Sequence, residues 1–340
     1  MVEQKYVFLV SGWGLGHATR SWAIIEQILN LDSSSKIIVF TWGSGISFFK
    51  SKLPHFEFEL HLLSSYFEID GLETGRAARI NLAHKLWAVA VWIKNSVYIH
   101  QHLKNQSNLV CIVDSDYHFL SYFFKASLLA SISQTPFIIH HWRQNFSKFS
   151  LLMNIRFVFF EWFDYFLQKL FCDIVFSPSF YQLAEYNKKI KFIPPIVRSE
   201  FLISRQGSAV HEVGVIGSGS TYSEEIKQKT RKLKYVYEEK NEFGLDANGL
   251  PLIDKFSRLI TQCGFSSLSE CFARSKPMVL DPIANHPEQV INACVLVAMN
   301  KASFFAKPII SMQMFRQPMK AKNWVQCNGA EVLARSLKTL

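Results

Sequence analysis

The alternation of short apolar runs with helix-period segments constrains this chain more than any other feature of its sequence. Residues 6–10 form a short apolar run, which suits a strand buried on both faces. A glycine-rich turn follows, residues 18–29 have the pattern of a helix, and residues 36–41 predict a second strand. Strands that alternate with helices indicate a parallel, doubly wound sheet, so we expect an α/β fold.

The same alternation continues through the first half of the chain. Further strands and helices are expected from the same patterns: strands at residues 108–113, 136–140 and 173–177, helices at 79–103 and 117–130. Pro194-Pro195 then interrupts the alternation and is the best linker candidate in the sequence.

A second series of strands and helices begins after this break. We expect strands at residues 212–216, 234–238, 259–262 and 277–280, and helices at 223–233, 265–274, 287–300 and 330–340. A length of 340 residues also favours two domains over one. The sequence therefore predicts two Rossmann-like, doubly wound domains that face a central cleft, over residues 1–195 and 196–340.

Composition and charge exclude several classes of protein. Hydrophobic residues make up 49% of the chain and charged residues 19%, which excludes a disordered chain. The net charge of +10 is spread through both halves without a basic tail, so we expect an anionic partner but no nucleic acid. The six cysteines show no metal-ligand or redox spacing, which favours buried free thiols. With no recognisable signal peptide, we expect a cytoplasmic protein, with a peripheral position on the inner face of the membrane as the alternative.

The first glycine-rich turn carries Gly12, Gly14 and Gly16, followed by His17. Glycines at such a turn let backbone N–H groups approach an anion at a helix N-terminus. The final glycine of a dinucleotide fingerprint is replaced here, which disfavours a dehydrogenase. A histidine at the C-terminal edge of a parallel sheet lies where chemistry occurs in such folds; the alternative is a tight turn with an incidental histidine.

A second constellation lies where a strand of the second half ends and the next helix begins. Ser267 and Glu270 fit the capping-box pattern S-x-x-E, which would give Glu270 a purely structural role. The amides of Ser266 and Ser267, at a helix N-terminus, also suit a diphosphate. Glu288 and Gln289 place a carboxylate beside an amide at a later helix start, which suits neighbouring sugar hydroxyls, although both fit equally as first-turn helix residues.

Four segments of the chain match, in order, the motifs of one enzyme superfamily: residues 14–20 (GLGHATR), 113–117 (VDSDY), 262–270 (QCGFSSLSE) and 288–293 (EQVINA). Together they resemble GT-B glycosyltransferases, in the group around the peptidoglycan N-acetylglucosaminyltransferase and the UDP-glucuronosyltransferases. The two C-terminal segments are the specific part of the resemblance. Gln262 and Ser266 depart from the glucuronosyltransferase pattern, which has His and Asn there, so the nucleotide preference stays open.

This resemblance implies a transfer of sugar from a nucleoside-diphosphate donor, expected to be UDP-linked, to an acceptor hydroxyl. The first domain would take the acceptor and the second the donor, with Glu270 on the ribose hydroxyls and Glu288 and Gln289 on the donor sugar. His17 would act near the anomeric carbon as general base or orienting group. The full donor-binding set that it implies is Gly14, Gly16, Gly217, Ser218, Gly219, Gly264, Phe265, Ser266, Ser267, Glu270, Glu288 and Gln289.

The expected chemistry is an inverting transfer that needs neither a metal ion nor a cofactor besides the donor. Negative charge develops on the leaving diphosphate, where backbone N–H groups and a helix dipole stabilise it. A histidine titrates near neutrality and suits removal of the acceptor proton. Asp114-Ser115-Asp116 matches the DxD motif with which another transferase class holds a cation. We expect instead that Asp116 orients a loop or the acceptor at the catalytic site, and that Asp114 is solvated.

The acceptor is the least defined partner, because a glycan, a glycolipid or a small molecule would each fit. His141 and Arg143 follow the strand expected at residues 136–140 and are the candidate acceptor contacts. The aromatic-rich residues 151–176 predict core packing, with a surface that rests on an anionic membrane as the alternative. A nucleotide-sugar hydrolase or 2-epimerase, and a non-catalytic nucleotide-sugar-binding subunit, remain alternative functions.

Overall fold

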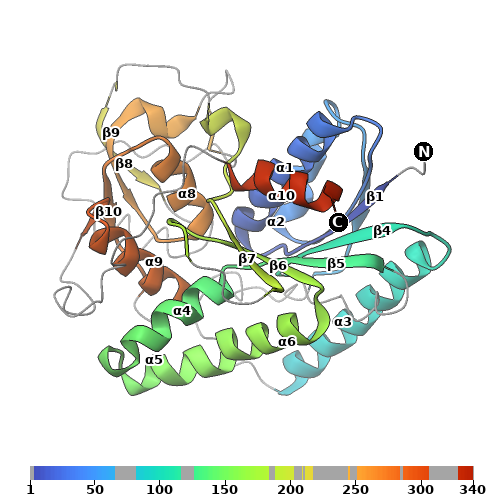
Figure 1. The fold of residues 1–340 in the computed structure, drawn as a ribbon, viewed down its shortest axis with the longest axis horizontal. Helices are drawn as coiled ribbons and strands as arrows, with labels where there is room; N and C mark the ends of the chain where they lie inside the picture. Colours follow the sequence, from blue (N-terminus) through green and yellow to red (C-terminus); the bar gives the residue numbers. More distant parts are fainter. Residues whose placement is uncertain are drawn as a thin grey trace.

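A computed structural model of the chain describes residues 4–65, 82–115, 126–183, 188–202, 209, 211–216, 244–245, 251–283, 286–305 and 328–339. Within these ranges the strands form two parallel sheets, one of seven strands and one of four (Figure 1). The helix expected at residues 223–233, the strand expected at 234–238 and most of the helix expected at 117–130 lie outside them.

The seven-stranded sheet has the order β3-β2-β1-β4-β5-β6-β7. Its strands are β1 (Lys5–Val10), β2 (Lys36–Thr41), β3 (Glu59–Leu62), β4 (Leu109–Asp114), β5 (Ala126–Ile132), β6 (Ile174–Pro178) and β7 (Ile190–Ile193). All six residues of β4 are buried, as the continuous apolar runs predicted. Helices α1 (Gly14–Leu31), α2 (Ser44–Lys52) and α3 (Leu82–Leu103) cover the sheet. Phe8 packs in one core and its neighbours Val7 and Leu9 in another, so hydrophobic cores lie on both faces.

The four-stranded sheet has the order β11-β10-β9-β8. Its elements are β8 (His211–Ile216), β9 (Phe256–Thr261), β10 (Met278–Leu280), β11 (Ala302–Phe304) and the helices α8 (Phe265–Ala273) and α9 (Pro287–Ala298). Short 3-10 turns lie at Phe146–Lys148, Ser199–Phe201 and Leu252–Lys255. The expected α/β architecture of two parallel, Rossmann-like sheets is confirmed.

The strand predicted at residues 136–140 is wrong, because these residues belong to helix α4 (Thr135–Asn145). Pro136 lies in the first turn of α4, where its missing N–H is not needed and its fixed φ favours helix formation. The strand of this region comes earlier, as β5, which pairs with β4 on one side and β6 on the other. Residues 126–130 had instead been expected to be helical, and that prediction is wrong too.

The C-terminal helix α10 (Gly329–Thr339) returns to the first half of the chain, where it packs against α1. Leu333 and Leu337 are buried in the same core as Phe8, and Figure 1 shows α10 beside α1. Asn328 fixes this return, because its side chain bonds both the N–H and the C=O of Val197, at 3.1 and 2.7 Å. The second domain was predicted to run to residue 340, but α10 belongs by its packing to the first core.

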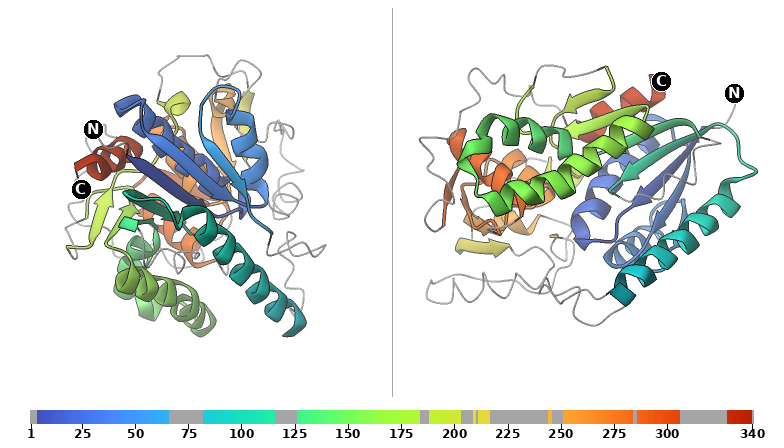
Figure 2. Two further views of the ribbon diagram at one scale, coloured as in Figure 1. Left: turned by 90° about the vertical axis from the view of Figure 1, so that its right-hand side faces the viewer. Right: turned by 90° about the horizontal axis from the view of Figure 1, so that it is seen from below.

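A long helical stretch follows α4: α5 (Leu151–Arg156), a π-helical segment (Phe157–Trp162) and α6 (Phe163–Phe171). It runs along the lower edge of the molecule in Figure 1 and faces the viewer in the view from below in Figure 2. Its outward side carries an α5–α6 apolar face, made of Leu151, Leu152, Ile155, Val158, Phe159, Trp162, Phe163, Phe166 and Leu170, all exposed. Core packing, predicted for this stretch, therefore holds only for inward residues such as Phe157 and Tyr165. Among the described residues, no helix is long and apolar enough to cross a membrane.

Candidate active site

The first glycine-rich turn brings His17 into the first turn of α1. Gly12 lies so close to Trp42 that a Cβ would stand 2.0 Å from the Trp42 carbonyl oxygen, and only glycine fits there. Gly14 begins α1 with a positive φ of 61°, which also favours glycine. The turn therefore needs its glycines for backbone geometry, and it holds the His17 imidazole at the carboxyl end of β1.

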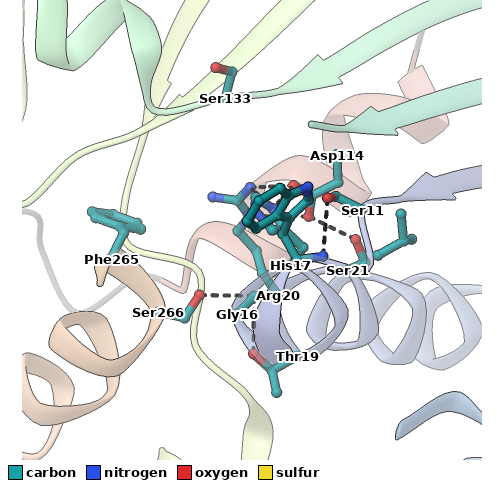
Figure 3. A network of polar contacts seen from close by, with 12 residues as sticks. Ser11, Gly16, His17, Thr19, Arg20, Ser21, Asp114, Ser133, Phe265 and Ser266 are labelled. Carbon is teal, nitrogen blue, oxygen red and sulfur yellow. Dashed lines mark hydrogen bonds and ion pairs between the residues drawn. The ribbon is translucent and has the colours of Figure 1, made fainter. Parts of the chain in front are cut away.

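Asp114 is the centre of a buried charged cluster at the end of β4, the strand next to β1 (Figure 3). His17 Nδ1 lies 2.8 Å from Asp114 Oδ1, and Ser21 Oγ donates to Oδ2 at 2.8 Å. The Arg20 guanidinium, 6% exposed, donates to both carboxylate oxygens and forms an ion pair with Asp114. Although burial of Asp114 opposes its ionisation, Arg20 and His17 prevail and lower its pKa to about 2.

The contacts of this cluster indicate which ring nitrogen of His17 carries the proton. Nδ1 lies 2.8 Å from an ionised carboxylate oxygen, which only accepts, and 3.1 Å from Arg20 Nη2, which only donates. The shorter contact with the carboxylate favours the neutral tautomer with its proton on Nδ1, facing Asp114. That leaves Nε2 of His17 as the basic nitrogen. The side chain is 27% exposed, so solvent reaches it, whereas Asp114 is fully buried.

Of the two predictions about the Asp114-Ser115-Asp116 segment, one is wrong and the other stays a prediction. Asp114 was expected to be solvated, and this is wrong, because its carboxylate is buried and engaged by three side chains. Asp116, which was expected to orient a loop or the acceptor at the catalytic site, lies outside the described residues. Asp114 could have been found from its place as the last residue of a wholly apolar strand, at the same sheet edge as His17.

The start of α8 faces this cluster from the second half of the chain. Ser266 Oγ donates to the Gly16 carbonyl oxygen at 2.9 Å, which joins the first glycine-rich turn directly to the start of α8 (Figure 3). Gly264 is the N-cap of α8, and a Cβ added there would meet nothing within 4 Å. The first-turn amides, among them those of Ser266 and Ser267, have no partner within the helix itself. This end of α8 is therefore suited to an anion, and a diphosphate bound there stays a prediction.

Glu270 has a charged partner that the sequence did not suggest. Arg198, 3% exposed and just beyond Pro194-Pro195, donates from Nε to Glu270 Oε1 at 2.8 Å. Burial raises the pKa of Glu270, although Arg198 opposes this by favouring the carboxylate. The capping-box alternative for Ser267 and Glu270 is wrong, because α8 begins at Phe265, and Ser267 lies inside it.

Glu288 and Gln289 begin α9 and have different surroundings. Glu288 Oε1 accepts the backbone N–H of Phe265 at 3.3 Å, so its carboxylate lies at the start of α8. Gln289 is 6% exposed and accepts the N–H of Ile283 at 3.0 Å, which anchors the preceding loop. Glu288 is thus beside the predicted diphosphate site, while Gln289 has a structural contact already.

The two predicted acceptor residues lie on α4. His141 is 1% exposed and accepts a hydrogen bond from Tyr181 Oη at 2.7 Å. Burial lowers the pKa of His141 to about 3, so the side chain is neutral at physiological pH. Arg143 is exposed and stacks over the Trp162 ring at 5.3 Å. An acceptor contact by either side chain stays a prediction, as do the donor contacts of Gly217, Ser218 and Gly219, which lie outside the described residues.

Comparison with known proteins adds independent findings. The sequence model of the family described as Glycosyl transferase family 1 matches residues 4–316. Among curated proteins, no sequence matches significantly. Solved structures with the same fold include TcCGT1 in complex with UDP, at 10% identity and a TM-score of 0.62, with 99% of this chain and 94% of that chain covered.

Two further structures are similar over nearly the whole chain. MurG of Acinetobacter baumannii is 11% identical with a TM-score of 0.55, and 99% of this chain and 100% of that chain are covered. UGT71G1 of Medicago truncatula, complexed with UDP-glucose, is 10% identical with a TM-score of 0.52, over 99% and 93% of the two chains. At these identities the likeness shows the fold, which is the two-domain GT-B arrangement.

Proposed function

Because the chain belongs to glycosyl transferase family 1, we propose that it transfers a sugar from a UDP-linked donor to an acceptor hydroxyl, with inversion and without a metal ion. The observation that carries this proposal is the pair of His17 and Asp114, 2.8 Å apart, directly across from the N-terminus of α8. Two of the similar structures are complexes with UDP or UDP-glucose, which supports the choice of nucleotide.

In this reaction His17 acts as the general base. Its Nε2 takes the proton of the acceptor hydroxyl while the hydroxyl oxygen attacks the anomeric carbon of the donor. The bond between that carbon and the diphosphate oxygen breaks, and UDP leaves with the electron pair. Asp114 orients the imidazole through Nδ1 and stabilises the imidazolium that forms, while Arg20 keeps the carboxylate ionised.

The start of α8 stabilises the leaving group. The charge that develops on the diphosphate faces first-turn amides and the positive end of the helix dipole, which are in place before the reaction begins. Glu270, held by Arg198, is positioned to accept hydrogen bonds from ribose hydroxyls. Glu288, at the same helix start, is positioned for the donor sugar.

Calorimetric titration tests the donor half of the proposal. We expect UDP to bind more tightly than GDP, dTDP or CMP, and Glu270→Ala to weaken UDP by about tenfold or more, since a hydrogen-bonded charged group is lost. Lys338→Ala, on the exposed last turn of α10, is the matched control. If no nucleotide bound, or if Glu270→Ala left the affinity unchanged, the donor assignment would fail.

Turnover tests the chemical half. Screening UDP-sugars with mixed acceptors should give a product that is lost in His17→Ala and that forms equally well with excess EDTA. Release of free sugar at the same rate without any acceptor would identify a hydrolase instead. Abolition of turnover by EDTA would contradict the metal-free mechanism.

The α5–α6 apolar face supports a further part of the proposal, which is that the enzyme docks on an anionic membrane. Nine apolar side chains of this face are exposed on one helical stretch, and Arg156 and Lys169 lie among them. Such a combination suits insertion into the lipid interface with attraction to acidic head groups. Flotation with anionic liposomes should carry the wild type upward, and Phe159→Ser with Phe163→Ser should prevent this. Leu202→Ser, an exposed apolar control away from the face, should float like the wild type; equal flotation of all three proteins would exclude this surface.

A further inference from the structure

The helical stretch that carries the α5–α6 apolar face also turns three polar side chains inward: Glu161, Asp164 and Gln168. Glu161 belongs to the π-helical segment, between exposed Phe159 and Trp162, yet it is part-buried. Asp164 is part-buried and Gln168 is 6% exposed, one helical turn apart. Segments of π-helix occur often at functional sites, since the extra residue redirects a side chain.

These inward groups meet Thr135 at the start of α4. Thr135 Oγ1 lies 3.1 Å from Glu161 Oε2 and 2.6 Å from Asp164 Oδ2. One hydroxyl proton cannot serve two carboxylates, so Glu161 must be protonated and donate to Thr135, which in turn donates to Asp164. The same assignment follows from electrostatics, because burial and the nearby Asp164 and Glu288 raise the pKa of Glu161 to about 8.

Asp164 and Gln168 add acceptors to this cluster. Asp164 Oδ2 also accepts from Gln168 Nε2 at 2.6 Å and from Ser133 Oγ at 3.4 Å. Gln168 Oε1, on the same amide, is buried and has no hydrogen-bond partner among the described residues. A buried, unsatisfied carbonyl oxygen beside two carboxyl groups marks a place where donors are missing.

The cluster lies next to the predicted reaction centre. Glu288 acts electrostatically on both Glu161 and Arg20, and its own carboxylate accepts the N–H of Phe265 at the start of α8. Ser133, at the end of β5, appears in the same close view as His17 and Asp114 (Figure 3). An acceptor bound for attack on the donor sugar has to approach this same place.

We propose that Glu161, Thr135, Asp164 and Gln168 form the subsite for the acceptor, and that it takes a head group rich in hydroxyl or ammonium donors and free of anionic groups. The inference rests on the proposed glycosyl transfer and names the chemical class of its acceptor. Two carboxyl groups and an unsatisfied carbonyl oxygen offer acceptors to donor groups, and the carboxylates of Asp164 and Glu288 repel anions.

Three hexoses of one size and different charge test the proposal on the full chain saturated with UDP. Glucose, glucosamine and glucuronate are titrated by saturation-transfer NMR into wild type, Glu161→Gln, Asp164→Asn and the exposed control Glu331→Gln. We expect the wild type and the control to bind glucose or glucosamine and to reject glucuronate. Asp164→Asn should weaken the bound hexose by about tenfold, in line with loss of a charged hydrogen-bond partner, and Glu161→Gln by about two- to tenfold, in line with loss of a neutral one. Glucose against glucosamine distinguishes hydroxyl from ammonium recognition.

UDP affinity, measured first, distinguishes failure of the proposed function from failure of the acceptor subsite. If the wild type bound no UDP, the proposed function would fail before the subsite was tested. If all variants bound UDP as the wild type does, they are folded and the hexose results apply to the subsite alone. Glucuronate binding as tight as that of glucose, unchanged hexose affinity in both subsite variants, or no hexose binding at all would each overturn the proposal.

Discussion

Asp114 organises the candidate site at the scale of single residues. Its buried carboxylate contacts three side chains: His17, the proposed base, Arg20 as counter-ion and Ser21 as a neutral donor. The three partners follow one another on a single helix, α1, at spacings that put them on the side of the helix facing β4. One strand end and one helix turn thus assemble the whole cluster.

We predict that Asp114→Asn lowers kcat by about a hundredfold or more, because the imidazole loses its orienting carboxylate. The double variant with His17→Gln should lose little more than His17→Gln alone, since the two residues act as a unit. Steady-state kinetics with a saturating donor measure this, and circular dichroism checks that each variant is folded. Losses that multiplied in the double variant would show that the two residues act separately.

The protonation of Glu161 predicts a pH dependence of stability. Its pKa is raised from 4.5 to about 8 in the folded chain, so its contribution is fully present below pH 4.5 and is lost as pH rises towards 8. His141 acts in the opposite sense, but only between pH 6.5 and about 3. Above pH 6.5 we therefore expect the free energy of unfolding to fall by up to about 1.4 kcal/mol per pH unit more in the wild type than in Glu161→Gln. Urea unfolding across this range measures the difference, and parallel profiles would refute the assignment.

At the scale of elements, α10 is the clearest case of a segment whose partner is distant in sequence. Its buried residues, Ala330, Leu333, Ala334 and Leu337, recur at helical spacing and face α1. Gly329 approaches the Pro194 carbonyl so closely that a Cβ would stand 2.1 Å from the oxygen. The end of the chain therefore closes over the linker at Pro194-Pro195.

We predict that Leu333→Ala destabilises the protein by about 2–5 kcal/mol, because it leaves a cavity in a fully buried position. Arg335→Ala is the matched control on the same helix, since Arg335 is exposed and its side chain pairs with Glu331 four residues earlier. That change should cost about 0.5 kcal/mol or less. Denaturant unfolding of both variants decides the matter, and a small effect of Leu333→Ala would mean that α10 contributes little to the first core.

At the scale of the whole molecule, the two halves share buried contacts. One hydrophobic core contains Phe137 and Trp142 of α4 together with Leu259 of β9 and Val290 of α9. Gln134 and Asn292 bond each other across the halves through both amide groups, at 2.6 and 3.2 Å, and both are buried. The second half is thus anchored on the first by apolar and polar contacts together.

We predict that Gln134→Ala and Asn292→Ala each lower the free energy of unfolding by about 1–3 kcal/mol, because each removes both hydrogen bonds between the two buried amides, of which Asn292 keeps only a further bond to the Cys263 carbonyl oxygen among the described residues. The double variant should lose less than the sum, with a coupling energy of about 0.5–3 kcal/mol. Urea unfolding of the four proteins gives this cycle. Simple additivity would mean that the observed pair does not couple the halves.

Much of the fold follows from patterns within the sequence. Apolar runs predicted β1, β2, β4, β6, β8, β9 and β10 because a strand buried on both faces needs continuous hydrophobic residues. The helices α1, α3, α8, α9 and α10 followed from their period and from their glycine and proline starts. Where the local pattern was ambiguous, prediction failed. The apolar run at residues 136–140 fits a buried strand as well as a buried helix. The pairing of β5 with β4 and β6 fills the place of that strand in the sheet, and residues 136–140 form a helix instead.

The sequence by itself determined the α/β class, the first glycine-rich turn and the placement of His17 and Ser266 in the first turns of α1 and α8, because these depend on neighbours within a few residues. Only the tertiary structure decided that Asp114 holds His17, that Arg198 holds Glu270, and that α10 belongs to the first core. Each of those contacts joins residues more than seventy positions apart, and no local pattern encodes which distant partner a buried charge or apolar face will meet. The same reason explains the aromatic-rich stretch: its composition suited a core, but Glu161 and Asp164 pack inward against Thr135, while Phe159, Phe163 and Phe166 lie on the outward side.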